Sequence, residues 1–169
     1  SRQENSAEHS WHLAVMALLL AEYADTPIDV AHVIKLLLVH DIIEIDAGDT
    51  PAFALTGHDT KVEREEIAAE RLFGLLPPDQ YQAVMALWRE FEAQETPDAH
   101  FALLVDRMSP LLQNAHSGDG GSWVAYQVTR EQVAKRMQPI QAYSQTLWAA
   151  TKAIIDQGVA DGFITIPTE

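Results

Sequence analysis

The chain has 169 residues, of which 47% are hydrophobic and 21% charged, enough for a substantial core in one domain over residues 1–169. Its formal net charge of −14 argues against extended nucleic-acid binding, and the absence of cysteine excludes disulfides and thiolate metal ligands. No apolar run approaches the roughly 18 residues of a membrane span, so we expect a soluble, cytoplasmic protein.

The first helix is expected to begin after Asn5 or Ser6, since either side chain can cap it. Its inward stripe is Leu13, Met16, Ala17 and Leu20, and it breaks at residues 25–27. His9 lies four residues before Leu13 and therefore on the same stripe. Because the sequence starts without an initiator methionine or a signal-peptide pattern, we expect that protein residues precede Ser1.

The second helix is predicted from Asp29 to about Ile45, before Gly48 and Pro51. Its inward positions are Val30, Val33, Ile34, Leu37 and Leu38, and His40 and Asp41 lie near its C-terminal end. Two further helices are predicted over residues 60–73 and 79–93, separated by Gly74 and two prolines.

The fifth helix is predicted to start at Thr96 and Pro97 and to reach about residue 115, with Asp106 in its middle. Residues 117–122 are expected to form a flexible surface loop. The last helix is predicted to start at Thr129, to be interrupted at Pro139 and to end at Gly158. Six helices with short connections predict an all-α, single-domain helical bundle.

Four ionisable residues on three of these helices could converge on one point. Asp41 has the phase of Leu37, and His40 is its neighbour, so both side chains can reach one ion near the helix end. His9 and Asp106 could complete a set of two imidazoles and two carboxylates. Such ligands suit Mn²⁺, Co²⁺, Zn²⁺ or Fe²⁺.

Each of these residues also has a simpler interpretation. A lone inward histidine is more often a hydrogen-bonded core residue than a ligand, and Asp106 could pair with Arg107. His12 could be a second ligand or a surface residue. The adjacent His40–Asp41 pair at the end of an apolar helix favours the metal site.

Three segments carry a resemblance to a known family: residues 4–10, residues 37–51 and residues 105–107. The second contains the pattern HDxxExxxxDxP, and it follows an ExxEHS segment. Over roughly residues 4–150 the chain resembles the HD-domain superfamily of metal-dependent phosphohydrolases, in the branch that contains the bacterial 5′-deoxynucleotidase.

The resemblance implies that His9, His40, Asp41 and Asp106 bind one divalent metal ion, of Mn, Co, Zn, Fe or Mg. It also implies catalytic roles for Glu44 and Asp49. The spacing agrees for Glu44, which stands three residues after Asp41 and four after His40, whereas the alternative role of Asp49 is that of a turn or capping acid.

The expected function is hydrolysis of a small phosphomonoester, most plausibly a (deoxy)nucleoside 5′-monophosphate, by a homodimer. Apolar positions on the last two helices could supply the dimer interface. The chain departs from the branch in two ways: it starts after the arginine-tryptophan segment of the nucleotide pocket, and it lacks the further histidines of dinuclear members. Alternatives are hydrolysis of a cyclic nucleotide or alarmone, iron-dependent oxidation, and a non-catalytic nucleotide-sensing module.

Overall fold

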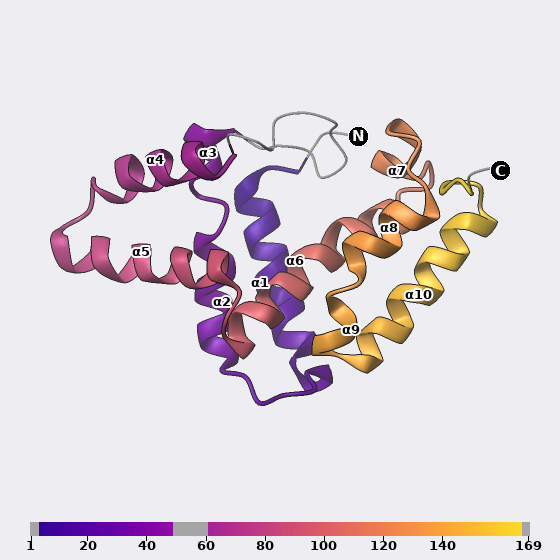
Figure 1. Ribbon diagram of the computed structural model, residues 1–169, viewed down its shortest axis with the longest axis horizontal. Coiled ribbons are helices and arrows are strands. Elements are labelled where there is room, and N and C mark those ends of the chain that lie inside the picture. The colour runs from indigo at the N-terminus through magenta and orange to yellow at the C-terminus, as the bar shows by residue number, and fades with distance from the viewer. Residues whose placement is uncertain (1–3, 49–60, 167–169) are drawn as a thin grey trace.

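The computed structural model describes residues 4–48 and 61–166, which form helices joined by short connections (Figure 1). In chain order the elements are α1 (Ser6–Leu20), the 3-10 helix η1 (Ala21–Tyr23), α2 (Val30–Val39), α3 (Glu44–Ala47), α4 (Lys61–Phe73), α5 (Pro78–Ala93), α6 (Pro97–His116), α7 (Gly121–Ala125), α8 (Arg130–Met137), α9 (Ile140–Tyr143) and α10 (Gln145–Ala160). Within these ranges no strand forms, apart from an isolated bridge between Thr129 and Thr165. The predicted all-α helical bundle is confirmed.

Side-chain caps fix three of the predicted helix starts. The Asn5 side chain accepts hydrogen bonds from two amides of α1, and Glu8 completes a capping box. Thr96 caps α6, and Thr129 forms a second capping box with Gln132 at the start of α8. Because these caps depend on nearby residues alone, the sequence was sufficient to place them.

Helix α6 lies at the centre of the fold and packs against α1, α2, α5 and α10. Figure 1 shows α4 and α5 on one side of it and α8 to α10 on the other. Its buried side chains, together with those of α1, α2, α8 and α10, form the main apolar core. A smaller core joins Val39 and Ile43 to α4 and α5. The start of α1, the end of α2 and the middle of α6 thus come together between these cores.

The predicted helix over residues 29–45 is wrong at its C-terminal end, because α2 stops at Val39. The imidazole of His40 lies 2.8 Å from the carbonyl oxygen of Leu37, the acceptor that the Asp41 amide would use if the helix continued. The next amides bond three residues back instead, from Ile42 to Val39 and from Glu44 to Asp41. A tight turn therefore separates α2 from α3.

The region predicted as one interrupted helix forms three helices. The chain breaks at Pro139, as predicted, and again at Ser144, whose extended backbone and hydroxyl cap α10. Gly158 lies inside α10 rather than at its end, and a Cβ there would come within 3.0 Å of Ile164 and Trp123. The segment expected as a loop gives way to α7 at Gly121.

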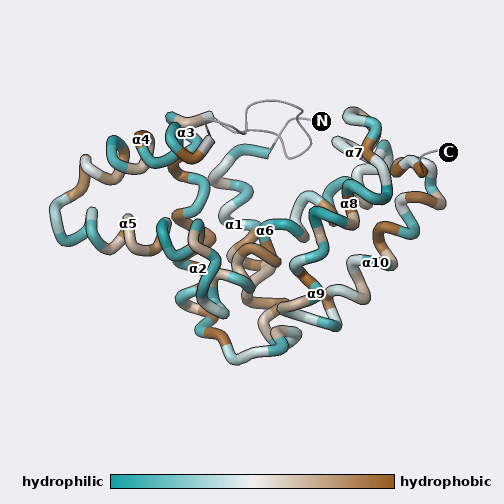
Figure 2. The backbone as a smooth tube through the Cα atoms, viewed as in Figure 1, coloured by the Kyte–Doolittle hydropathy of each residue, from teal (hydrophilic) through white to brown (hydrophobic). Residues whose placement is uncertain are grey.

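None of the helices in the described part of the chain is long and apolar enough to cross a membrane. Figure 2 shows hydrophilic and hydrophobic residues alternating along each helix. This is the pattern of helices that bury one face and expose the other.

Candidate metal centre

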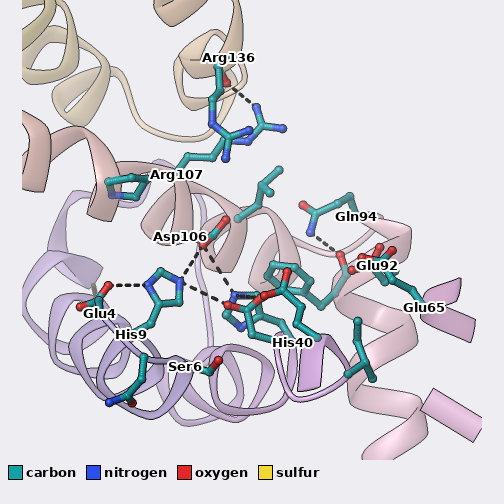
Figure 3. A pocket seen from close by; sticks show the side chains of 17 residues that line it. Glu4, Ser6, His9, His40, Glu65, Glu92, Gln94, Asp106, Arg107 and Arg136 are labelled. Atoms are coloured by element: carbon teal, nitrogen blue, oxygen red, sulfur yellow. Dashed lines mark hydrogen bonds and ion pairs between the residues drawn. The ribbon is translucent and has the colours of Figure 1, made fainter. Parts of the chain in front are cut away.

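A cavity of about 660 Å³ opens where α1, α2, α5, α6 and α8 meet (Figure 3). The predicted ligands His9, His40, Asp41 and Asp106 all line it, and so does Glu44. Its volume falls in the range of small-molecule sites. The structure therefore brings together five of the six residues singled out from the sequence, and Asp49 lies outside the described residues.

His9 lies in the first turns of α1, with one ring nitrogen towards Glu4 and the other towards the carboxylates. Its Nδ1 is 3.2 Å from Oε2 of Glu4. Its Nε2 is 3.2 Å from Oδ1 of Asp106 and 3.6 Å from Oδ2 of Asp41. A carboxylate behind a histidine is the usual device for holding the ring of a metal ligand in one orientation.

His40 is the C-cap residue of α2, and its side chain is buried. Because Nδ1 donates to the Leu37 carbonyl, the tautomer is fixed and Nε2 is left to face the cavity. Nε2 lies 3.0 Å from Oδ1 of Asp41 and 3.7 Å from Oδ1 of Asp106. Within the described part of the chain it forms no hydrogen bond of acceptable geometry. A buried ring nitrogen of this kind, aimed at two carboxylates, is suited to bind a cation.

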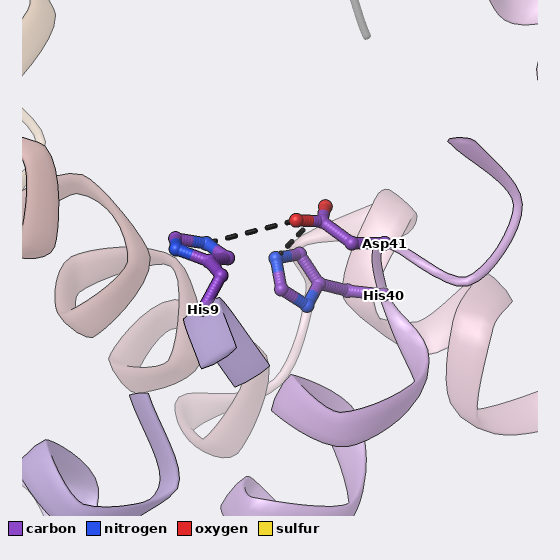
Figure 4. A group of neighbouring side chains, drawn as sticks. All are labelled: His9, His40 and Asp41. Carbon is purple, nitrogen blue, oxygen red and sulfur yellow. Dashed lines mark ion pairs between the residues drawn. The ribbon is translucent and has the colours of Figure 1, made fainter. Parts of the chain in front are cut away.

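The ligand atoms of His9, His40 and Asp41 lie within 4.8 Å of one another (Figure 4). Two atoms each about 2.1 Å from one ion are roughly 3.0–3.4 Å apart in octahedral or tetrahedral geometry. The separations of 3.0–3.7 Å at the centre, with Asp106 included, are close to these values. His9, His40 and Asp41 thus fit a single divalent cation, and Asp106, which is not part of this group of three, lies against both histidines.

The four side chains strongly perturb one another's protonation. Burial opposes a charge on His40, but Asp106 and Asp41 outweigh it and raise the pKa of His40 to about 10. Burial also opposes ionisation of Asp106, yet His40 and His9 hold its pKa well below the usual range. The pKa of His9 is raised in the same way, chiefly by Asp106. Without a metal, the carboxylates therefore favour the protonated forms of His40 and His9.

Glu44 reaches the cavity by a different route from the one expected. A continuous helix would place Glu44 on the same face as His40 and Asp41, as predicted, but α2 ends at Val39, before all three residues. Instead, the turn over residues 40–43 carries Glu44 to the start of α3, where it lines the cavity.

The other described histidines have protein partners outside this cluster. His32 pairs with Glu90 at 2.7 Å, and His100 stacks on Tyr143. His116 bonds to a backbone carbonyl of its own helix. His12 lies 3.7 Å from the far oxygen of Glu4, so the structure places it behind that carboxylate rather than among the predicted ligands.

Several residues of the cavity were missed by the sequence reasoning. Glu4 belongs to the ExxEHS segment, and its position five residues before His9 is the one local signal of its role. Arg107 was considered only as a counter-ion of Asp106, but its Nη1 donates to the backbone carbonyl of Arg136, 2.6 Å away. The remaining cavity residues missed are Glu65, Glu92, Gln94 and Arg136.

A family model described as the HD domain matches residues 1–148. The chain belongs to the HD-domain family. A crystal structure of a predicted metal-dependent phosphohydrolase from Magnetospirillum magnetotacticum MS-1 has the same fold. Its TM-score is 0.89 at 50% identity, and the match covers 99% of this chain and 83% of that one.

This HD-domain chain is also similar to curated proteins named 5′-deoxynucleotidase HDDC2. The protein from Bos taurus is 31% identical over 118 residues, which are 70% of this chain and 56% of that protein. The one from Homo sapiens is 30% identical with the same coverage, and the one from Xenopus laevis is 33% identical over 66% of this chain and 54% of its own length. The chain thus spans little more than half the length of these relatives.

Proposed function

We propose that this HD-domain protein hydrolyses phosphomonoesters, with (deoxy)nucleoside 5′-monophosphates as the preferred class. The observation that carries the proposal is the buried Nε2 of His40, held by its tautomer towards two carboxylates in a nucleotide-sized cavity. The named activities of the HDDC2 proteins and of the Magnetospirillum protein support it.

The proposed ligands of one divalent ion are His9, His40, Asp41 and Asp106. Two imidazoles and two carboxylates suit Mn²⁺, Co²⁺, Zn²⁺, Fe²⁺ or Mg²⁺ and leave coordination positions for other groups. One ion is proposed because, among the described residues, the other histidines bond elsewhere. When bound, the ion would acidify water and polarise the phosphoryl oxygens.

The protein's own side chains would position and deprotonate the reactants. Glu4 and the Leu37 carbonyl hold the rings of His9 and His40 in place. Glu44, which lines the cavity, would take the proton of the attacking water. Asp49 is proposed to assist the leaving oxygen or to contact the sugar.

The test is phosphate release from a panel of ribo- and deoxyribonucleoside monophosphates by protein of measured metal content, with Mn²⁺, Co²⁺, Mg²⁺ and Zn²⁺ supplied in turn. Asp106→Asn should lower both bound metal and activity. Glu44→Gln and Asp49→Asn should keep the metal and lose activity by roughly 10²–10⁴-fold. His116→Gln, on the exposed end of α6, is the matched control.

If the protein binds metal but releases no phosphate from any monophosphate, the proposed activity is wrong. Turnover of a cyclic nucleotide or an alarmone alone would assign a different phosphate ester. Binding of nucleotides without turnover would assign the sensing role that some HD domains have.

We also propose that the protein works as a homodimer in the cytoplasm. The support for a dimer is on α1, where Trp11, Leu18 and Leu19 expose 68%, 61% and 67% of their surface. Trp11 and Leu18 are seven residues apart and share a helical face. The exposed apolar side chains thus favour α1, rather than the last two helices, as the interface. Light scattering of the wild type and of Leu18→Glu tests this.

A further inference from the structure

Two arginines line the cavity without an ion pair to any carboxylate in the described part of the chain. Arg107 follows Asp106 on α6, Arg136 lies near the end of α8, and both are half-buried. The bond from Arg107 Nη1 to the Arg136 carbonyl places them next to each other (Figure 3). In the described part of the chain neither guanidinium forms an ion pair. By contrast, Arg71, Arg89 and Arg130 each form an ion pair with a described carboxylate.

This arrangement is electrostatically costly without an anion. The two cations are half-buried next to each other, and burying a charge without a counter-charge is unfavourable. Each guanidinium carries five N–H donors, and only one bond to a described acceptor, from Arg107, is formed. An anion bound between the two groups would supply both the missing charge and the missing acceptors.

The rest of the cavity disfavours an anion. Its described lining includes six carboxylates, from Glu4, Asp41, Glu44, Glu65, Glu92 and Asp106. Figure 3 shows Glu65 and Glu92 at a different part of the cavity from the two arginines. An anionic group that enters the cavity is therefore directed to the side formed by α6 and α8. The planar guanidinium fork matches the oxygens of a phosphoryl group.

We infer that Arg107 and Arg136 bind the phosphoryl group of the substrate beside the predicted metal ligands. This inference rests on the proposed function and narrows it, because a terminal phosphate offers three free oxygens and two charges to the arginines. A phosphodiester offers two oxygens and one charge. The arginine pair thus selects phosphomonoesters over cyclic or internal diesters.

Arg136 gives the cleaner test, because its guanidinium bonds to no described residue and its substitution removes no described contact of that group. Arg136→Met keeps the apolar stem, which also borders a second cavity of about 160 Å³. Lys135→Met is the matched control, since Lys135 is the preceding, exposed residue of the same helix. Calorimetry on metal-loaded protein, with inorganic phosphate and a phosphate-free nucleoside as probes, measures binding without turnover.

For Arg136→Met we expect phosphate binding weaker by roughly 10–100-fold, a matching rise in KM for monophosphates, and unchanged metal content and nucleoside binding. The phosphate affinity of Arg136→Lys should lie between those of Arg136→Met and the wild type, because lysine keeps the charge and loses the planar pair of N–H donors. Lys135→Met should behave as wild type.

Unchanged phosphate affinity in folded Arg136→Met or Arg136→Lys would overturn the inference, as would an equal loss of nucleoside binding. The two proposals fail separately. A wild type that binds phosphate through Arg136 but hydrolyses no monophosphate contradicts the proposed function alone. A wild type that hydrolyses monophosphates, with phosphate binding indifferent to Arg136, contradicts the inference alone.

Discussion

Metal binding should release a proton from His40 at a pH where an ordinary histidine has none to release. In the metal-free site the neighbouring carboxylates raise the pKa of His40 to about 10. At pH 8 such a group is about 99% protonated, whereas a histidine at the ordinary value of 6.5 is about 3% protonated. Because the metal needs the neutral ring, binding at pH 8 should expel about one proton from His40, and more if His9 contributes.

The number of protons is measured by titrating metal into metal-free protein in buffers of different ionisation enthalpy. The slope of the observed enthalpy against the buffer enthalpy gives the proton count. The apparent affinity should also rise about tenfold between pH 7 and pH 8, because each pH unit below the pKa costs a factor of ten. His116→Gln, remote from the cluster, should give the same count. A slope near zero at pH 8, with tight binding, would refute this account of the site.

Three further outcomes are expected. Glu4→Ala should weaken metal binding by roughly 10–100-fold, measured by chelator competition, because His9 loses the carboxylate that orients it. Asn5→Ala should lower the free energy of unfolding, measured with denaturant, by about 1 kcal/mol and should also weaken metal binding. Thr129→Ala, at the other capping box, should lower the free energy of unfolding by a similar amount and leave the metal affinity unchanged. In metal-free protein, the raised pKa of His40 adds stability that is complete below pH 6.5 and declines as the pH rises towards 10. The melting temperature of metal-free protein should therefore fall between these pH values. The melting temperature of metal-bound protein should not fall over the same interval.

Each of these three predictions can be contradicted by a specific result. Equal metal affinity in Glu4→Ala and wild type would remove Glu4 from the support of His9. Equal loss of metal affinity in the Asn5 and Thr129 variants would point to general destabilisation. A melting temperature of metal-free protein that rises from pH 6.5 to pH 9 would contradict the charge balance described for the cluster.

The sequence was enough to predict where the helices start and which ligands lie on inward helix faces. Both features depend on residues that are close together in the chain. Asn5, Thr96 and Thr129 act on amides two or three residues away, and the pattern around Leu13 fixes the side of α1 that carries His9. Even without a tertiary structure, these signals were enough to place His9 and Asp106 on inward faces.

The end of α2 could not be predicted, because it depends on which group bonds to the Leu37 carbonyl, the His40 imidazole or the Asp41 amide. Hydrophobic periodicity does not reveal this competition. The apolar pattern continues to Ile45, and helical phase alone favours one helix. The imidazole of His40 bonds to the Leu37 carbonyl, and the chain turns. The same bond fixes the tautomer of a proposed ligand, so the local error in the prediction and the organisation of the site have one cause.

Arg136 was also beyond reach of the sequence, since nothing near it in the chain marks it. It meets Arg107 across a separation of 29 residues, through the packing of α8 against α6. The basic residues in the last turn of α8 suggest a solvent-exposed helix end, and Lys135 is indeed exposed there. Only the tertiary structure separates the arginine that lines the cavity from the lysine beside it.

If the proposed function is correct, the charge distribution explains why two kinds of cation would be needed to act on a phosphate. The chain carries a net charge of −14, and the described lining of the cavity has six carboxylates against two arginines. A phosphate dianion would be repelled from such a surface. A divalent ion at the histidine-aspartate cluster reverses the field at one point, but it attracts any anion. The arginine pair adds direction, because its N–H groups donate hydrogen bonds to oxygens in a fixed plane. The metal would thus provide the attraction and the arginines the orientation, which agrees with the position of the two guanidiniums beside Asp106.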